Sequence, residues 1–341
     1  MAASFRPRAR RADPFLRLVI IPILAFLAAC GPSAVVPTAP PGSTSSAAPP
    51  ETATPAAPTA TPAPTFPLTI TDDEGSSVAI PAEPARIVSL TPAATETLFA
   101  LGADDRVVAV VEDIAGYPPG AEDLPVVATF QGVDVEQIVS LEADLVIAGG
   151  GNPSFTPIAA IEQLRRVGIP VVVLYARNID QALAGIRLVG LATGTSATAD
   201  RLAAAMATEM AQLGAATAVL EHPKVFYEID ATSKIYTVPE TSLYAEMLIL
   251  AGADPITTDD SYEISLEELV AADPDVILLG DDADYTTAAD VAARPGWGDI
   301  TAVKEGAVIP IAAYVLVTRP GPRLVEGLRA LIEALHPEVL R

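Results

Sequence analysis

Two segments of this chain each occur twice, and the repetition restricts the folds open to it. Residues 134–149 match residues 265–280 in residue type at most positions, at an offset of 131 residues. Residues 98–104 match residues 248–254 at an offset of 150 residues. Offsets of this size are typical of duplicated domains, whereas solenoid repeats recur every ~20–50 residues. The repetition predicts two similar lobes; chance similarity between amphipathic helices is the alternative.

Short apolar runs alternate with helical patterns from residue 66 onward, which is typical of parallel βα units. Residues 68–70 and 78–80 alternate around Asp72–Gly75 and predict a β-hairpin. The sequence thus predicts an α/β fold of two lobes. Further strands are expected at residues 87–90, 107–111, 145–148, 171–174, 225–229, 276–279 and 308–311.

A single helix is expected to join the lobes. Apolar residues recur at helical spacing between Leu202 and Leu213, and the surrounding Ala residues favour helix. Such a helix would connect the lobes more stiffly than a loop. The expected boundaries are an N-terminal lobe at residues 66–195, an inter-lobe helix at 196–219 and a C-terminal lobe at 220–341.

The first 29 residues have the pattern of an export signal. Residues 1–17 carry five Arg, and the next twelve residues are mostly apolar but too few to span a bilayer. Leu27-Ala-Ala-Cys30 resembles the bacterial lipobox, whose Cys is lipidated and begins the mature protein. We therefore expect lipidation of Cys30, with an ordinary secretory signal as the alternative. Arg10-Arg11 leaves both Sec and twin-arginine export open.

Residues 31–65 have the composition of a linker. They are almost all Pro, Ala, Ser, Thr and Gly, with ten Pro and one charged residue, so they cannot bury a core. Cys30 and this segment are expected to form a lipidated, disordered tether that reaches on the order of 100 Å when extended. The body is then expected on the outer face of the cell membrane, in the periplasm or at the cell surface.

The charge balance excludes some partners. The chain has 20 Lys and Arg against 43 Asp and Glu, a net charge of −23, which becomes −27 without the first 29 residues. An acidic body is repelled by nucleic acid and by anionic lipid, so no nucleic-acid partner is expected and the lipid anchor must hold the protein at the membrane. Two His disfavour a His-rich metal site, and one Cys excludes an internal disulfide.

Motifs of enzyme active sites are absent from the sequence. It contains no GxSxG, P-loop, HExxH or CxxC motif, and no GxGxxG after a strand. This favours a binding protein; an anchored hydrolase, the alternative, would need a nucleophile–base pair in a chain with two His. Ligands of open α/β sheets bind at the carboxyl ends of the strands. Those positions here are residues 91–92, 149–152, 175, 228–230, 281 and 312–314.

Several helices have recognisable first residues. Thr91-Pro92 is expected to begin a helix as the N-cap and first position. Asp134 and Ser265 begin the two repeated helices, and each is expected to form a capping box with the residue three positions later. Glu136 and Glu267 are then left facing solvent at equivalent positions. The helix dipole alone would explain each Glu, whereas one exposed Glu per lobe also suits a partner with two-fold symmetry.

From about residue 68 to its end, the chain resembles the cobalamin and iron-complex substrate-binding proteins of ABC importers. The resemblance implies an α/β fold of two Rossmann-like lobes joined by a single long helix, the class III periplasmic-binding-protein fold, in a monomer with little hinge closure. It rests on the order of six motifs, RIVSLTPAATE (86–96), YPPGA (117–121), FQG (130–132), the Glu136 helix with ADLVI (143–147), VFYEID (225–230) and RPGPR (319–323).

The resemblance also implies a function. The ligand is held between the lobes and delivered to an ABC permease and ATPase complex, with no enzymatic step and no cofactor beyond the ligand. Family members pair one Glu per lobe with Arg pockets on the two permease subunits, and the matching positions are Glu136 and Glu267. A surface-anchored sensor or scavenger that works without a permease is the alternative.

The resemblance and the strand-end positions supply the candidate ligand-binding residues. Phe130 stands where cobalamin-binding members have Trp, and an acidic residue expected near Tyr314 is missing. The candidates are Pro92, Tyr117, Phe130, Gln131, Gly132 and Gly150 of the first lobe and Glu228, Asp230, Tyr236, Tyr314, Arg319 and Arg323 of the second.

The ligand itself is open between three classes. Anionic ferric siderophores need a basic site, which only Arg177, Arg294, Arg319 and Arg323 are placed to provide. Haem needs an axial His or Tyr. A corrinoid brings its own metal ligands and needs mainly aromatic and polar contacts. We therefore expect a corrinoid, with the iron complexes as alternatives.

Overall fold

The structure is a computed structural model. It describes residues 64–341 apart from 114, 115, 117, 151–155, 260, 281–284, 312–315 and 318. The expected signal sequence, the lipidation site Cys30 and nearly all of the tether lie outside the described residues. The described residues belong to one compact unit of the chain, Pro58–Arg341. Within them, no helix is both long and apolar enough to cross a bilayer.

The first lobe contains a six-stranded sheet with the order β6-β5-β4-β3-β7-β8. All neighbouring strands are parallel except β5 and β6, which pair antiparallel. The strands are β3 (Ile87–Ser89), β4 (Val107–Val111), β5 (Val126–Thr129), β6 (Gly132–Val133), β7 (Leu145–Gly149) and β8 (Val171–Leu174). The helices are α1 (Pro92–Ala100), η1 (Asp104–Arg106), α2 (Val135–Ser140), α3 (Ile158–Arg166) and α4 (Ile179–Thr193).

A β-hairpin, β1 (Leu68–Thr71) and β2 (Ser77–Ile80), covers the free edge of this sheet, and its turn lies where the sequence predicts it. The Asp73 N–H donates to the Val173 carbonyl (3.0 Å), and the Tyr175 N–H donates to Asp73 Oδ2 (2.8 Å). Burial raises the pKa of Asp73, and the bond from Tyr175 opposes that shift. The turn therefore pairs edge groups of β8 that would otherwise be open to another strand.

The second lobe has a smaller parallel sheet with the order β11-β9-β13-β14. Its strands are β9 (Lys224–Glu228), β11 (Asp254–Pro255), β13 (Val276–Leu279) and β14 (Val308–Pro310), beside an antiparallel pair, β10 (Ile235–Tyr236) and β12 (Glu263–Ile264). The helices are α6 (Leu243–Leu250), α7 (Leu266–Ala272), α8 (Ala288–Ala293), α9 (Thr301–Glu305), α11 (Leu324–Leu335) and η2 (Pro337–Leu340).

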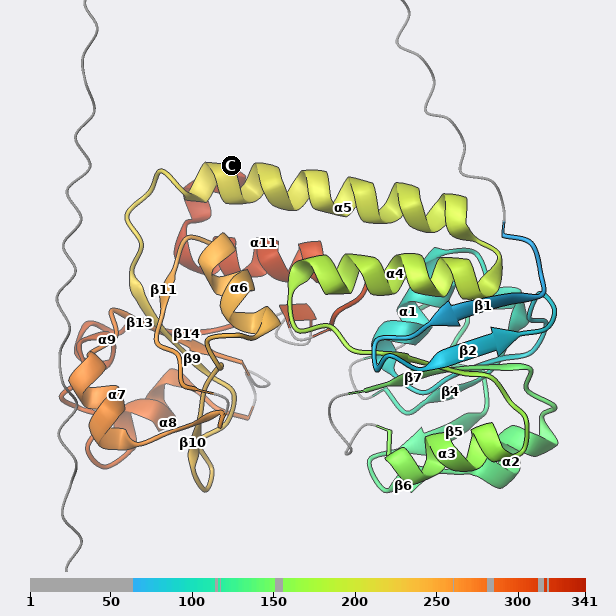
Figure 1. Ribbon diagram of the computed structural model, residues 1–341. Coiled ribbons are helices and arrows are strands. Elements are labelled where there is room, and N and C mark those ends of the chain that lie inside the picture. The colour runs from blue at the N-terminus through green and yellow to red at the C-terminus, as the bar shows by residue number, and fades with distance from the viewer. Residues whose placement is uncertain are drawn as a thin grey trace, which may run out of the picture. The chain divides into compact units, whose positions relative to one another are not determined.

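The expected inter-lobe helix is α5 (Ser196–Thr217), whose 22 residues run along both lobes with α4 beside it (Figure 1). Its predicted apolar face is buried at Met206, Met210 and Leu213. Gly190 of α4 has Ala199 against its backbone, where a larger side chain would not fit, so the two helices pack closely. The class III fold, with two α/β lobes joined by one long helix, is confirmed.

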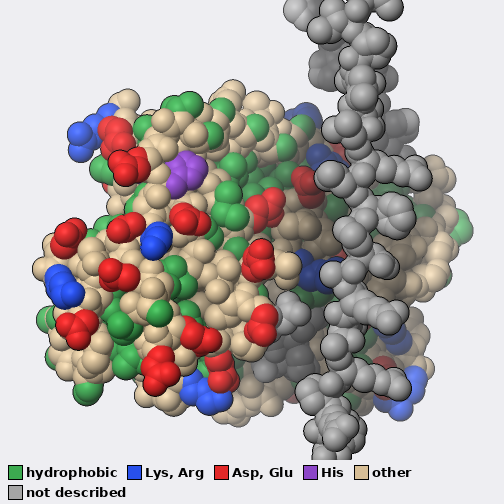
Figure 2. Space-filling view, turned by 60° about the vertical axis from the view of Figure 1, so that its left-hand side comes forward, with side chains coloured by type: hydrophobic (Ala, Val, Ile, Leu, Met, Phe, Trp, Pro, Cys, Tyr) green, Lys and Arg blue, Asp and Glu red, His purple; other side chains and the backbone are tan. Residues whose placement is uncertain are grey.

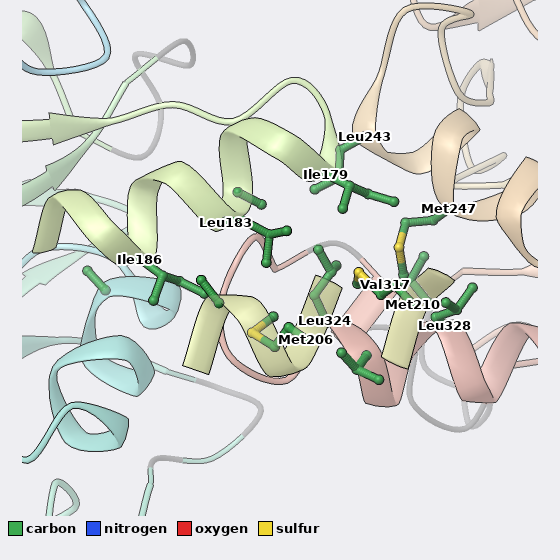
Figure 3. Close-up of a cluster of buried hydrophobic side chains, with 14 of the residues drawn as sticks. Ile179, Leu183, Ile186, Met206, Met210, Leu243, Met247, Val317, Leu324 and Leu328 are labelled. Carbon is green, nitrogen blue, oxygen red and sulfur yellow. The ribbon is translucent and has the colours of Figure 1, made fainter. Parts of the chain in front are cut away.

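One apolar core extends across the junction of the lobes (Figure 3). It contains side chains of α4 from the first lobe, of α5, and of α6 and α11 from the second. Two further clusters belong to single lobes, one on the first sheet and one on the second. Because the shared cluster is continuous, moving one lobe against the other would disturb a packed interior. The residues labelled in Figure 3 are Ile179, Leu183, Ile186, Met206, Met210, Leu243, Met247, Val317, Leu324 and Leu328.

The two repeated helices begin as expected, with one difference. Ser265 and Glu268 form the complete capping box of α7. At α2, only one of the two hydrogen bonds of a capping box is among the described contacts. It is the bond from the Gln137 N–H to Asp134 Oδ1 (2.9 Å).

Replacing Ser265 with alanine is expected to lower the free energy of unfolding by about 1 kcal/mol, because a helix N–H loses its acceptor. Urea denaturation measures the loss, with Ser233→Ala at an exposed loop position as the control. The box lowers the pKa of Glu268, so its carboxylate stabilises the fold above the unfolded pKa and loses that effect as pH falls through the folded pKa. Equal losses in the two variants would contradict the capping role.

Candidate ligand-binding site

In the first lobe, α1 begins at the carboxyl end of β3 as the sequence predicts. Thr91 Oγ1 accepts from the Ala94 N–H (3.1 Å), and Pro92 occupies the first helical position. A helix start at a strand end is where open α/β sheets present ligand-facing groups. Pro92 is half-buried there.

The predicted FQG motif forms the turn between β5 and β6. Phe130 is 70% exposed, which is unusual for a Phe side chain. The Gln131 N–H donates to Thr129 Oγ1 (3.1 Å), and Gly132 has a φ of 148°. The turn thus holds an aromatic ring in solvent at the carboxyl end of a sheet strand.

Gly150 follows β7 and lies against the hairpin turn. Its N–H donates to the Leu174 carbonyl (2.8 Å). A Cβ at this position would lie 2.7 Å from Val173 Cγ1 and 2.9 Å from Glu74 Oε1, so the close approach requires glycine. Its role as a ligand contact stays a prediction.

In the second lobe, Glu228 ends β9 and is 2% exposed. Both of its carboxylate oxygens accept from Arg294, at 2.6 and 2.8 Å. The Arg294 guanidinium carbon also lies 4.7 Å from the centre of the Trp297 ring. A bidentate pair of this kind gives both carboxylate oxygens hydrogen-bond donors, whereas an unpaired buried carboxylate would destabilise the fold.

The structure brings Asp230 and Tyr236 together just beyond β9. The Tyr236 N–H donates to the Asp230 carbonyl (2.8 Å). The Asp230 carboxylate accepts from both the N–H (3.1 Å) and the hydroxyl (3.0 Å) of Thr232. These two predicted residues therefore share one tight hairpin.

Arg319 connects the two lobes. Its Nη1 donates to Glu96 Oε1 of α1 (2.8 Å) and to Asp113 Oδ2 after β4 (2.9 Å), and its Nη2 donates to Asp113 Oδ1 (2.6 Å). Burial lowers the pKa of Arg319, but the bonds and charges of Asp113 and Glu96 outweigh it and raise that pKa above the usual value. Arg323 is 46% exposed at its side chain, bonds to Glu326 (3.0 Å) and has Nη1 4.0 Å from Glu96 Oε1.

Three tyrosines from the two lobes also lie near one another. Burial, and then the neighbouring Tyr262 and Tyr175, raise the pKa of Tyr244 to about 12. Tyr175 follows β8, and the strand-end rule identifies it from sequence. Tyr262 has a φ of 61°, in a region that bulky residues rarely adopt. Nothing in the sequence pattern marks Tyr244 or Tyr262.

Two predicted ligand residues cannot be placed, and the groove between the helices contains none of the others. Tyr117 and Tyr314 lie outside the described residues. A mainly apolar groove of about 510 Å³ is lined by α4, α5 and α6, and none of the predicted ligand residues lines it. Among the residues that the structure describes, no group of three His, Cys, Asp or Glu side chains could hold a metal ion.

The two candidate docking residues occupy equivalent places. Glu136 is the second residue of α2 and Glu267 the second residue of α7, and both are exposed. Acidic side chains also spread over the second lobe, with fewer Lys and Arg among them (Figure 2). Such a surface favours a basic partner and repels polyanions.

Comparisons with known proteins place the chain among binding proteins. Residues 87–315 match the family model described as periplasmic binding protein. The chain is 33% identical over 282 residues to an uncharacterised ABC transporter substrate-binding lipoprotein, YvrC, of Bacillus subtilis, which covers 81% of this chain and 88% of that protein.

Two solved structures extend the likeness to the fold. The periplasmic vitamin B12 binding protein BtuF of Vibrio cholerae has a TM-score of 0.64 and 25% identity, over 76% of this chain and 99% of that one. The periplasmic heme-binding protein RhuT of Roseiflexus sp. RS-1 has a TM-score of 0.63 and 26% identity, over 73% of this chain and 98% of that one.

Proposed function

We propose, since this chain belongs to the periplasmic binding protein family, that it captures a corrinoid between its two lobes and delivers it to an ABC importer. The family and the relatives make it a substrate-binding protein of an ABC transporter of the B12, iron-complex or haem type, and not an enzyme. Three further statements are proposals: that the ligand is a corrinoid, that Cys30 carries a lipid anchor and that the protein is a monomer. The relative named as a lipoprotein supports the anchor.

The ion pairs of the arginines are the observation that favours a corrinoid ligand over an anionic siderophore. Arg294 and Arg319 each hold buried carboxylates, and Arg323 pairs with a Glu of its own helix turn. Arg177 lies with its guanidinium carbon 6.0 Å from the centre of the Tyr175 ring. Neutralised arginines attract an anion weakly, whereas aromatic and hydroxyl groups suit a large uncharged ring system.

Haem is the second candidate, because phenol oxygens can serve as axial ligands to iron. Tyr175 and Tyr262 are both 39% exposed, which leaves them open to a ligand. Burial raises the pKa of Tyr244 to about 12, which disfavours the phenolate form that iron prefers. The similar structure of RhuT, a protein named as heme-binding, supports keeping haem as a candidate.

Calorimetric titration of the full mature chain with Cys30→Ser tests the ligand class. Cyanocobalamin and cobinamide are expected to bind with submicromolar affinity, and haemin and a ferric siderophore more weakly. Tighter haemin binding, with a shifted absorbance band, would replace the corrinoid by haem. Binding of none of the four would reject the ligand class altogether.

We also propose that Glu136 and Glu267 dock the loaded protein on the importer. Their exposure and their equivalent helix positions on two similar lobes support this, because a permease of two like subunits offers two equivalent basic sites. A sensor or scavenger without a permease is the alternative, and a neighbouring receptor kinase gene in place of permease and ATPase genes would favour it.

A further inference from the structure

We propose that Arg319 is a positioning residue, which sets the spacing of the two lobes for the ligand without itself contacting it. The proposal rests on the proposed function, in which the ligand binds between the lobes. Arg319 lies between β14 and α11 of the second lobe, and both of its partners belong to the first. Its three hydrogen bonds to Glu96 and Asp113 therefore hold one lobe to the other.

The burial of these groups makes the spacing well defined. The side chains of Arg319, Glu96 and Asp113 are 12%, 5% and 2% exposed. In a poorly hydrated site, charges attract strongly at short range and lose hydration that only close pairing replaces. A small separation of the lobes would break the bonds before water could hydrate the charges. The energy therefore rises steeply on either side of the observed geometry.

The same segment also packs directly on the start of α1. A Cβ added at Gly321 would lie 3.4 Å from the Ala93 carbonyl oxygen, so the backbone at Gly321 packs against the first turn of that helix. Pro92, in that turn, is a predicted ligand contact. Arg319 and Gly321 together thus fix where α1 presents its first residues.

A second polar contact joins the lobes at a different place. Glu246 Oε2 of α6 accepts from the Ile179 N–H at the start of α4 (2.7 Å). This contact and the shared core keep α4, α5 and α6 together when the Arg319 cluster is lost. Losing Arg319 should therefore widen the separation on the α1 side and leave the fold in place.

Spin labels on opposite lobes measure this separation without any ligand. The labels are placed at Ser140→Cys in α2 and Glu305→Cys in α9, both exposed positions, in the full chain with Cys30→Ser. Arg319→Met is expected to lengthen and broaden the distance distribution, and Arg319→Lys to restore part of it. Arg329→Met, which breaks an exposed ion pair between α11 and Glu209 of α5, is expected to change nothing.

Titration with cyanocobalamin completes the test. Arg319→Met is expected to weaken binding about tenfold or more, and Arg319→Lys to recover part of the loss. An unchanged distance distribution overturns the proposal, whether or not binding falls. If Arg319→Met does not fold, the variant Arg319→Met, Glu96→Gln, Asp113→Asn carries the same measurement, because it leaves no buried charge unpaired. If the wild type binds no corrinoid, the proposed function fails, while the distances still decide the role of Arg319.

Discussion

Replacing Arg294 with alanine is expected to lower the free energy of unfolding by about 3–5 kcal/mol. The variant leaves the Glu228 carboxylate, 2% exposed, without either of its two hydrogen bonds. A buried carboxylate in that state must lose its charge or draw water into the lobe, and both are costly. The contact between the guanidinium and the Trp297 ring is lost as well. Urea denaturation followed by circular dichroism measures the change.

The control is an ion pair of similar length at the surface. Lys234 Nζ lies 2.7 Å from Glu263 Oε1, but these side chains are 59% and 44% exposed. Lys234→Ala is expected to lower the free energy of unfolding far less than Arg294→Ala, because solvent already screens the pair. If the two variants cost the same, burial is not what makes Glu228 depend on Arg294.

Replacing Glu136 and Glu267 together with alanine is expected to reduce ligand uptake about 1,000-fold or more while leaving ligand affinity unchanged. Each Glu would lose a charged partner that becomes buried when the protein docks on the permease, and such losses cost ~2–5 kcal/mol each. Neither Glu is needed for its helix cap, so the fold should persist. Accumulation of radiolabelled cyanocobalamin in vesicles containing the permease and ATPase measures uptake, and calorimetry measures affinity.

A second pair of substitutions removes the same charge elsewhere. Glu162 on α3 and Glu333 on α11 are exposed helical residues, one in each lobe. Glu162→Ala with Glu333→Ala is expected to transport normally. An equal loss of uptake in the two double variants would mean that general acidity brings the protein to its importer, and normal uptake in both would reject the docking role of Glu136 and Glu267.

Local chemistry is the part of this structure that the sequence could predict. The N-cap at Thr91, the capping box at Ser265 and the hairpin around Asp72 each depend on residues within about four positions, and all three are confirmed. The seven longer strands expected from apolar, β-rich runs are all present, but β5, with the sequence VVAT, was missed. Strands of two residues, such as β6 and β10, were missed because so short a segment carries no periodic pattern.

Long-range pairing is the part that the sequence could not predict. Glu228 and Arg294 are 66 residues apart, and Arg319 is 223 residues from Glu96. Glu228 and Arg319 were both predicted as ligand contacts, because a charged residue in the sequence does not reveal which distant residue pairs with it. The meeting of Tyr175 with Tyr244 and Tyr262 likewise depends on how two lobes are set against each other.

The core shared by α4, α5, α6 and α11 limits how the two lobes of this chain could be exchanged or expressed separately. A fragment that ended before α5 would expose Ile179, Leu183 and Ile186 to water, and would be prone to aggregate. A chimera with a relative would have to carry these four helices from one parent. Each lobe has its own sheet, but the helices packed between the two sheets make the lobes inseparable.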